Sequence, residues 1–263
     1  MSRSGVESNV LSFAVKSMAS IPRLSVVIAS YNEEKRLPAT LARLEAYFQE
    51  AKISHEFVIV NDGSIDGTIG VAEEFGLSTG AVVKVYSHFP NHGRGASIRE
   101  GMLAATGDFV LDTDADCSVD PEAIGRFIQQ FEKEPELDVL FGSRMMKGAK
   151  ITYQQPPLRI FMGYGFLYLT RFMFWSWRTT DFALGFKMLR RAAAQDVFQH
   201  QYDNHFTAEA EIVYVTKLRG WKSAELPVIW TDDRDSRIKP LRDAIRSFKG
   251  LNRVLLNRLA GKY

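Results

Sequence analysis

The first half of the chain alternates between apolar runs and segments with helical spacing. Five apolar runs rich in β-branched residues predict buried strands that end in turn residues or polar side chains. They are RLSVVIAS (23–30), HEFVIVNDGS (55–64), AVVKVYSH (81–88), GDFVLDTDAD (107–116) and LDVLFGSR (137–144). Helical spacing recurs between them, at 40–51, 69–76, 98–106 and 120–134. Strands that alternate with helices predict an α/β fold, with a mostly parallel central sheet covered by helices on both faces.

The second half has a less regular pattern. Its predicted elements are an aromatic-rich helix (156–178), a turn leading into a strand (181–191), a helix (206–220) and a strand (221–232). No repeat or linker interrupts the pattern, so we expect one domain over residues 24–235. Residues 1–23 predict a flexible or loosely docked extension, and residues 236–263 predict a basic, amphipathic C-terminal helix.

The net charge of +2 on 263 residues hides an asymmetry. From Arg237 to the C-terminus there are eight basic residues and one acidic residue, a charge of +7 that leaves −5 on the preceding 236 residues. A tail of this kind favours an anionic partner. The acidic remainder and the lack of a base-reading module argue against nucleic acid. The single cysteine fits a reducing compartment.

Two apolar stripes have helical spacing. The first consists of Leu158, Phe161, Met162, Phe166, Leu169, Phe172 and Met173, and the second of Leu241, Ile245, Phe248, Leu255 and Leu259. A stripe such as the first is more often core than membrane contact. Beside the second run Arg242, Arg246, Lys249 and Arg253, a pattern typical of helices on a membrane surface. We therefore expect peripheral attachment to the cytoplasmic side of a membrane; the alternative is a solvated helix docked on the catalytic domain.

The predicted strand ends carry the unusual polar residues. Asp112, Asp114 and Asp116 alternate, so they share one face if the segment stays extended. Hard carboxylates in a small cluster suit Mg²⁺ or Mn²⁺, which keep positions open for phosphate oxygens. Asp62 follows another strand, and Gly93 and Gly95 of NHGRGAS could expose backbone N–H groups as a phosphate cradle. Neither the P-loop ending nor dinucleotide spacing is present.

Together these segments resemble a known family. The motifs SVVIASYNEEKRLP, VIVNDGSIDGT, NHGRGASIREGMLAATGD, TDAD, FGSR, TDFALGFKML and AELPVIW occur in the order found in inverting GT-A glycosyltransferases of family 2. The chain is most similar to the dolichyl-phosphate (polyprenyl-phosphate) hexose synthases, and closer to their glucosyl than to their mannosyl branch. The resemblance implies transfer of glucose from UDP-glucose to a polyprenyl or dolichyl phosphate. GDP-mannose, another UDP-sugar and another acceptor remain alternatives.

The resemblance also implies roles for individual residues. Ala29, Tyr31, Glu33, Asp62, Arg94 and Arg237 are assigned to the donor, with Asp62 on the base. Asp114 and Asp116 match the family's D-A-D and would bind the diphosphate through Mg²⁺ or Mn²⁺. Arg144 and Arg159 would meet the acceptor phosphate, and Arg234 and Arg237 would belong to a loop over the diphosphate. Asp181, Glu209 and Glu211 are candidates to contact the sugar or the arginines. The third metal ligand, the role of Asp112 and the oligomeric state stay open.

Overall fold

The computed structural model describes residues 9–13, 21–152, 157–231 and 240–263, with only the backbone described at 9–13 and 240–244. Eight strands form the main sheet, in the order β1-β4-β3-β2-β5-β8-β6-β9. Their bounds are β1 (Asn9–Phe13), β2 (Leu24–Ser30), β3 (His55–Asn61), β4 (Val83–Ser87), β5 (Phe109–Thr113), β6 (Val139–Ser143), β8 (Phe186–Arg190) and β9 (Ser223–Pro227). Two short strands, β7 (Lys150–Ile151) and β10 (Ile229–Trp230), pair separately.

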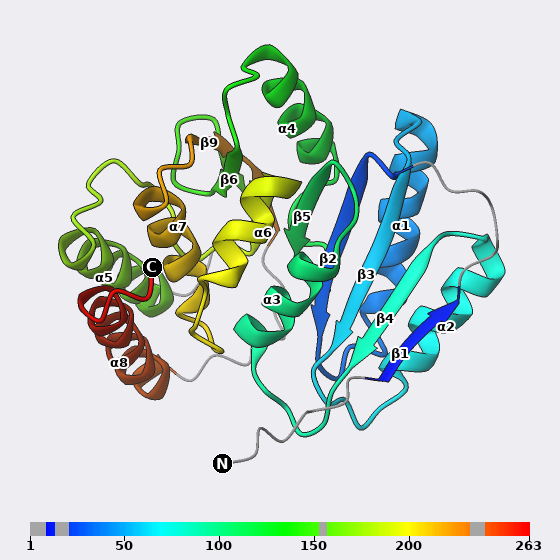
Figure 1. Cartoon of the computed structure of the whole chain (residues 1–263), viewed down its shortest axis with the longest axis horizontal. Helices are drawn as coiled ribbons and strands as arrows, with labels where there is room; N and C mark the ends of the chain where they lie inside the picture. The colour runs from blue at the N-terminus through cyan, green and yellow to red at the C-terminus, as the bar shows by residue number, and fades with distance from the viewer. Residues whose placement is uncertain (1–8, 14–20, 153–156, 232–239) are drawn as a thin grey trace.

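Helices occupy both faces of the sheet (Figure 1). They are α1 (Leu37–Ala51), α2 (Thr68–Thr79), α3 (Arg94–Ala104), α4 (Glu122–Lys133), α5 (Pro157–Met173), α6 (Arg191–Gln199), α7 (Ala208–Leu218) and α8 (Pro240–Leu259). Successive residues of a strand point to opposite faces. Val26 and Ile28 of β2 accordingly pack in the core with α1, α2 and α4, whereas Val27 packs in the core with α3, α6 and α7.

The mostly parallel sheet predicted from the sequence is confirmed. Strands β2 to β6 and β9 run in one direction, while β1 is antiparallel to β4 and β8 is antiparallel to both β5 and β6. The reversed direction of β8 was not predicted, because an apolar strand pattern carries no direction. Helix α6 was also missed, since it begins directly after β8 without turn residues that would mark its start.

Part of the N-terminal extension is a strand. Asn9–Phe13 pairs antiparallel with β4 at the edge of the sheet, with Asn9 opposite Ser87 and Phe13 opposite Val83. The structure places this stretch in a regular ladder, and how loosely the extension is held stays a prediction. The division of the chain at residues 23 and 235 stays a prediction.

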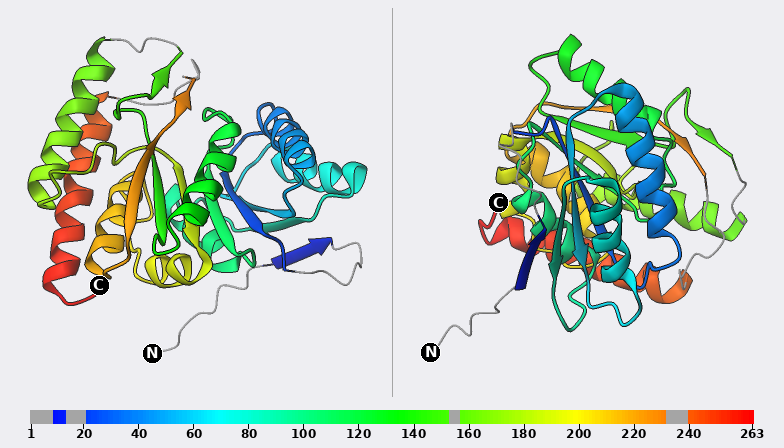
Figure 2. Two further views of the ribbon diagram at one scale, coloured as in Figure 1. Left: turned by 90° about the horizontal axis from the view of Figure 1, so that it is seen from above. Right: turned by 90° about the vertical axis from the view of Figure 1, so that its right-hand side faces the viewer.

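The two predicted apolar stripes are each divided between core and surface. Helices α5 and α8 lie side by side (Figure 2), and both contribute to the hydrophobic core that also contains α3, α6 and α7. On α5, Phe166, Leu169 and Met173 pack against this core, but Phe161 and Phe172 are exposed. On the described part of α8, the buried large apolar residues are Leu251 and Val254, whereas Ile245, Phe248 and Leu259 of the predicted stripe are exposed; the side chain of Leu241 lies outside the described residues. Within the described ranges, no helix is both long and apolar enough to span a bilayer.

Gly101 allows α3 to pack closely on the sheet. A Cβ there would overlap a methyl group of Val27 and lie 3.0 Å from Cγ2 of Val60, and neither branched side chain can turn away easily. We expect Gly101→Ala to lower the free energy of unfolding by about 1–2 kcal/mol, because overpacking outweighs the better helix propensity of alanine. Urea unfolding measures this change.

The control is Gly70→Ala in α2, where an added Cβ meets nothing within 4 Å. This variant should gain up to about 1 kcal/mol from propensity alone. A Gly101→Ala protein as stable as Gly70→Ala would contradict the packing explanation.

Candidate active site

The predicted site residues follow the carboxyl ends of parallel strands. Tyr31 follows β2, Asp62 follows β3, Asp114 follows β5 and Arg144 follows β6. In open α/β sheets, ligands bind in the crevice outside these ends. The topology therefore places the predicted donor, metal and acceptor residues along one edge of the sheet.

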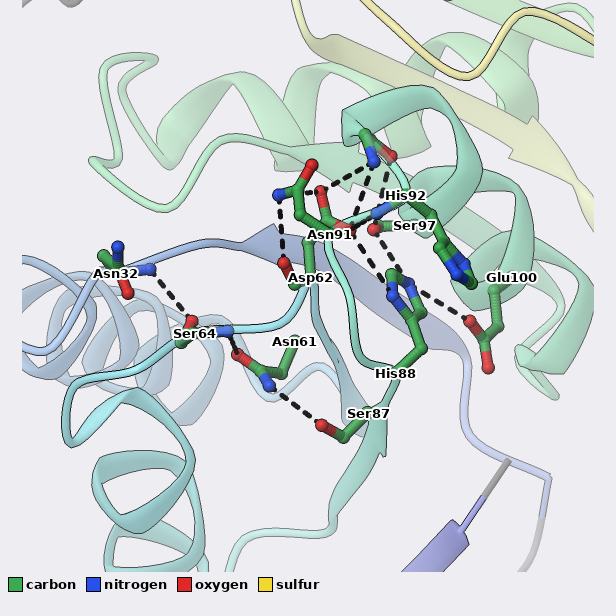
Figure 3. A network of polar contacts seen from close by, with 11 residues as sticks. Asn32, Asn61, Asp62, Ser64, Ser87, His88, Asn91, His92, Ser97 and Glu100 are labelled. Carbon is green, nitrogen blue, oxygen red and sulfur yellow. Dashed lines mark hydrogen bonds and ion pairs between the residues drawn. The ribbon is translucent and has the colours of Figure 1, made fainter. Parts of the chain in front are cut away.

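The carboxylate of Asp62 is held by the loop between β4 and α3 (Figure 3). Its Oδ1 accepts the backbone N–H of His92 at 2.7 Å, and its Oδ2 accepts the Asn91 side-chain amide at 2.8 Å. The N–H of Gly93 lies between the two oxygens, 3.2 and 3.0 Å from them. Asp62 thus fixes the shape of the loop, and its assignment to a nucleotide base stays a prediction.

The same network connects neighbouring strand ends. The side-chain amide of Asn61 donates to the hydroxyl oxygen of Ser87 at the end of β4. Its side-chain oxygen accepts the backbone N–H of Ser64. The imidazole rings of His88 and His92 stack with centroids 4.3 Å apart beside Asp62, as Figure 3 shows. The ends of β3 and β4 are therefore connected as one unit before any ligand binds.

The expected phosphate cradle in NHGRGAS is not found at Gly93 and Gly95. Gly93 donates its N–H to Asp62, and Gly95 donates to the carbonyl of Asn204 at 2.9 Å. A Cβ at either glycine would overlap the backbone of residues 203–204. These glycines thus allow two segments to approach closely, and their N–H groups already have protein acceptors.

The D-A-D segment forms a turn after β5. The N–H of Cys117 bonds to the carbonyl of Asp114, and Thr40 of α1 donates its hydroxyl to the carbonyl of Ala115 at 2.7 Å. Asp116 accepts the N–H of Ser118 through Oδ1 at 3.0 Å. Burial raises the pKa of Asp116, and the charge of Asp114 raises it further. A bound cation would relieve this repulsion.

Arg94 lies among three carboxylates. Its Nη2 donates to Oδ1 of Asp114 at 2.6 Å and lies 3.7 Å from Oδ1 of Asp112, while its Nη1 donates to Glu209. Glu209 also accepts a bond from the buried ammonium of Lys187, on β8 directly opposite Asp112. Burial raises the pKa of Asp112 to about 6, an effect that the Arg94 charge opposes. This cluster consists of two cationic side chains, Arg94 and Lys187, and three carboxylates, Asp112, Asp114 and Glu209.

The residues present suit a divalent metal that is completed by substrate oxygens. In the described ranges, no three His, Cys, Asp or Glu side chains form a group that could hold a metal ion alone. Mg²⁺ and Mn²⁺ sites in transferases commonly take one or two carboxylates and complete the shell with phosphate oxygens and water. Asp114 already accepts a hydrogen bond from a cationic group, Arg94, and Asp116 is a second carboxylate in the same turn.

Arg144 is fixed by a buried partner. Its Nε and Nη2 donate to the two oxygens of Asp181 at 2.8 and 2.9 Å, and its guanidinium lies over the ring of Trp230, 5.2 Å from the centroid. Burial alone would raise the pKa of Asp181, but the charge and hydrogen bonds of Arg144 outweigh it and lower this pKa. Glu225, which the sequence did not single out, accepts the N–H groups of Thr180 and Asp181.

The remaining predicted residues occupy different settings. Ala29 lies within β2, Tyr31 is exposed just after it, and Glu33 forms an ion pair with Arg36 at 2.5 Å. Arg159 is half-buried in the first turn of α5. Glu211 binds the backbone N–H groups of residues 202 and 203 instead of an arginine. Arg234 and Arg237 lie outside the described residues.

Lys187 is the main residue of the cluster that sequence reasoning missed. Its signal was a lysine inside the apolar strand GFKML, where a charge is buried only with a partner. The partner, Glu209, is more than twenty positions away, and no spacing rule connects the two.

Comparison with known proteins agrees with this architecture. A family model described as Glycosyl transferase family 2 matches residues 25–198. Dolichyl-phosphate beta-glucosyltransferase of Mus musculus is 30% identical over 251 residues, covering 92% of this chain and 77% of that protein. The crystal structure of Mycobacterium tuberculosis glucosyl-3-phosphoglycerate synthase has a TM-score of 0.63 at 16% identity, covering 90% of this chain and 80% of that one.

A further structure of that synthase contains Mn²⁺, UDP-glucose and phosphoglyceric acid. Its TM-score is 0.60 at 16% identity, and the match covers 89% of this chain and 79% of that one. The expected GT-A fold is thereby confirmed. The family match and the shared fold identify an enzyme: the chain belongs to glycosyl transferase family 2.

Proposed function

We propose that this enzyme transfers glucose from UDP-glucose to a polyprenyl or dolichyl phosphate, with inversion at the sugar. The observation that carries the proposal is that an acidic group and an arginine both follow the carboxyl ends of parallel strands in the same sheet. Asp114 and Asp116 suit a metal–diphosphate, and Arg144, held by Asp181, suits a phosphate monoester. The mouse relative, a dolichyl-phosphate beta-glucosyltransferase that is 30% identical over most of both chains, supports this donor sugar and acceptor.

The chemistry asks little of a general base. A phosphate monoester has its second pKa near ~6, so the acceptor is largely ionised at neutral pH. The enzyme must mainly align the acceptor with the sugar C1 and stabilise the leaving diphosphate. A divalent metal supplies positive charge to that leaving group when bound. Asp114 and Asp116 would hold it, and Mn²⁺ in the UDP-glucose complex of the structural neighbour supports the choice of metal.

In this arrangement the protein orients the acceptor with a preformed fork. Two hydrogen bonds join the Asp181 carboxylate to one edge of the Arg144 guanidinium and fix its plane. The ring of Trp230 restricts the guanidinium from a second side. We infer that this orientation presents the acceptor phosphate to the sugar and that Arg159 is a second contact to the phosphate.

A transfer assay with a donor panel tests the proposal. Labelled UDP-glucose, UDP-galactose, UDP-GlcNAc and GDP-mannose are each offered with a short polyprenyl phosphate and Mn²⁺. UDP-glucose should be the preferred donor, and EDTA should abolish transfer. Preference for GDP-mannose would contradict the donor assignment, and full activity in EDTA would contradict the metal.

We also propose that the exposed face of α5 and α8 attaches the enzyme to the cytoplasmic face of an anionic membrane. Both helices carry exposed apolar side chains, and α8 also carries exposed basic residues, among them Arg246, Lys249 and Arg253. Such a surface suits a membrane interface, because the apolar side chains can insert among the acyl chains while the basic side chains contact the anionic headgroups. Each basic residue near the surface would add about 1 kcal/mol.

Vesicle flotation tests this attachment. The double change Phe161→Ser and Phe172→Ser removes two rings that are 76% and 64% exposed. We expect it to lower binding to phosphatidylserine-containing vesicles roughly tenfold, since losing part of each ring's burial costs about 1.4 kcal/mol in total. The control is Leu77→Ser on α2, which is 71% exposed on another helix and should bind as the wild type does. An equal loss in both proteins would contradict the assignment of this face.

A further inference from the structure

Asp112 has a buried carboxylate whose two oxygens lack a hydrogen-bond donor in the described part of the chain. The side chain is 0% exposed in β5, and neither carboxylate oxygen has a hydrogen-bond donor among the residues that the structure describes. Such groups are rare in native structures, because a buried acceptor without a partner loses the hydrogen bonds that water gave it. An unsatisfied carboxylate at this place suggests that its partner is present in another state of the enzyme.

Arg94 is the nearest candidate for that partner. One end of its guanidinium is anchored, because Nη1 donates to Glu209 and Glu209 is itself held by Lys187. The other end lies between two acceptors, with Nη2 at 2.6 Å from Asp114 and 3.7 Å from Asp112. A shift of about 1 Å would bring Nη2 to hydrogen-bond distance from Asp112.

The position on Asp114 conflicts with the proposed chemistry. Asp114 is a carboxylate expected to hold the metal with the donor diphosphate, and a guanidinium on one of its oxygens repels a divalent cation at that carboxylate. Arg94 must then leave Asp114 when the donor binds, while its anchor on Glu209 remains. Asp112 is the buried acceptor within reach that has both oxygens unsatisfied in the described part of the chain.

We propose that Arg94 has two positions, on Asp114 before the donor binds and on Asp112 afterwards, and that Asp112 is a positioning residue that frees Asp114 for the metal. This inference rests on the proposed metal–diphosphate site. It gives Asp112 a role without making it a metal ligand. The carboxylate acts through Arg94, so its influence on metal affinity should depend on that side chain.

A double-mutant cycle on Mn²⁺ affinity tests the dependence. Free Mn²⁺ is measured by its paramagnetic resonance signal, with saturating UDP and no acceptor, for wild type, Asp112→Asn, Arg94→Gln and the double variant. Asp112→Asn should weaken Mn²⁺ binding about tenfold in the wild type, because Arg94 then stays on Asp114. With Arg94→Gln already in place, the same change should cost at most twofold.

The outcomes separate the inference from the proposed function. A ratio of three or more between the two effects of Asp112→Asn supports the two-position arginine. A smaller ratio overturns it, whether because Asp112 binds the metal directly or because it has no influence. Absence of UDP-dependent Mn²⁺ binding in the wild type would contradict the metal–diphosphate site itself. If Arg94→Gln does not fold, Arg94→Lys replaces it, because a single ammonium cannot bridge Glu209 and Asp112 together.

Discussion

Asp116→Asn is expected to lower sugar transfer at least 100-fold, whereas Asp112→Asn should retain measurable activity at saturating Mn²⁺. Asp116 lies in the turn after β5, where its Oδ1 accepts the N–H of Ser118, and its carboxylate is a proposed metal ligand. An amide supplies neither the charge nor the second carboxylate oxygen. Removing one group that stabilises the charge of a transition state typically lowers the rate 10²–10³-fold. Initial rates at saturating donor and Mn²⁺ measure the difference.

Asp120→Asn is the matched control for this pair. Asp120 stands four residues beyond Asp116 and accepts the N–H of Glu122, the first residue of α4, at 3.0 Å. Asparagine caps helices about as well as aspartate, so activity should stay within roughly twofold of wild type. Equal, large losses from Asp112→Asn and Asp116→Asn would instead indicate a site built from three carboxylates.

Asp181→Asn should reduce kcat/KM for the acceptor by roughly 10–100-fold, with the donor KM little changed. The asparagine keeps the shape of the side chain but loses the charge and one of the two acceptors that fix Arg144. Because the pair is buried, with Asp181 3% exposed, breaking it should also cost about 3 kcal/mol of stability. Acceptor titrations at saturating UDP-glucose and urea unfolding measure the two effects.

A second bidentate pair provides the control. Arg219 donates to both oxygens of Asp196 in α6 at 2.9 and 2.8 Å, through the same two nitrogens but at a more exposed place. Asp196→Asn should leave the acceptor KM unchanged and cost at most about 1 kcal/mol, as exposed ion pairs do. A rise in donor KM alone after Asp181→Asn would place Arg144 on the donor and not on the acceptor.

The sequence predicted the fold well where periodicity and turn residues agree. The strands β2 to β6 and the helices between them lie where the pattern placed them, because parallel strands buried on both faces are continuous apolar runs. The edge strand β1 was missed, since NVLSF is short and lies in a polar segment. The direction of β8 depends on how the chain returns to the sheet, and a local pattern contains no such information.

The sequence predicted the positions of the candidate residues at the strand ends, but not the partners that they contact. Strand ends pointed to Asp62, Asp114 and Arg144, because ligand sites gather there in α/β folds. That Asp62 would hold its own loop, and that Arg94 would lie on Asp114, depends on segments brought together only by the fold. Asp112 looked equivalent to its neighbours in sequence; its complete burial separates it from them.

The most direct test of the proposed function is the phase in which the labelled sugar is recovered. Wild-type enzyme, Mn²⁺ and labelled UDP-glucose are offered a short polyprenyl phosphate together with phosphoglyceric acid, the small phosphorylated acid bound by the structural neighbour. The label should appear in the organic phase as a β-linked glucosyl lipid phosphate. Label that stays in the aqueous phase on phosphoglyceric acid, or an α-linked lipid product, would contradict the account.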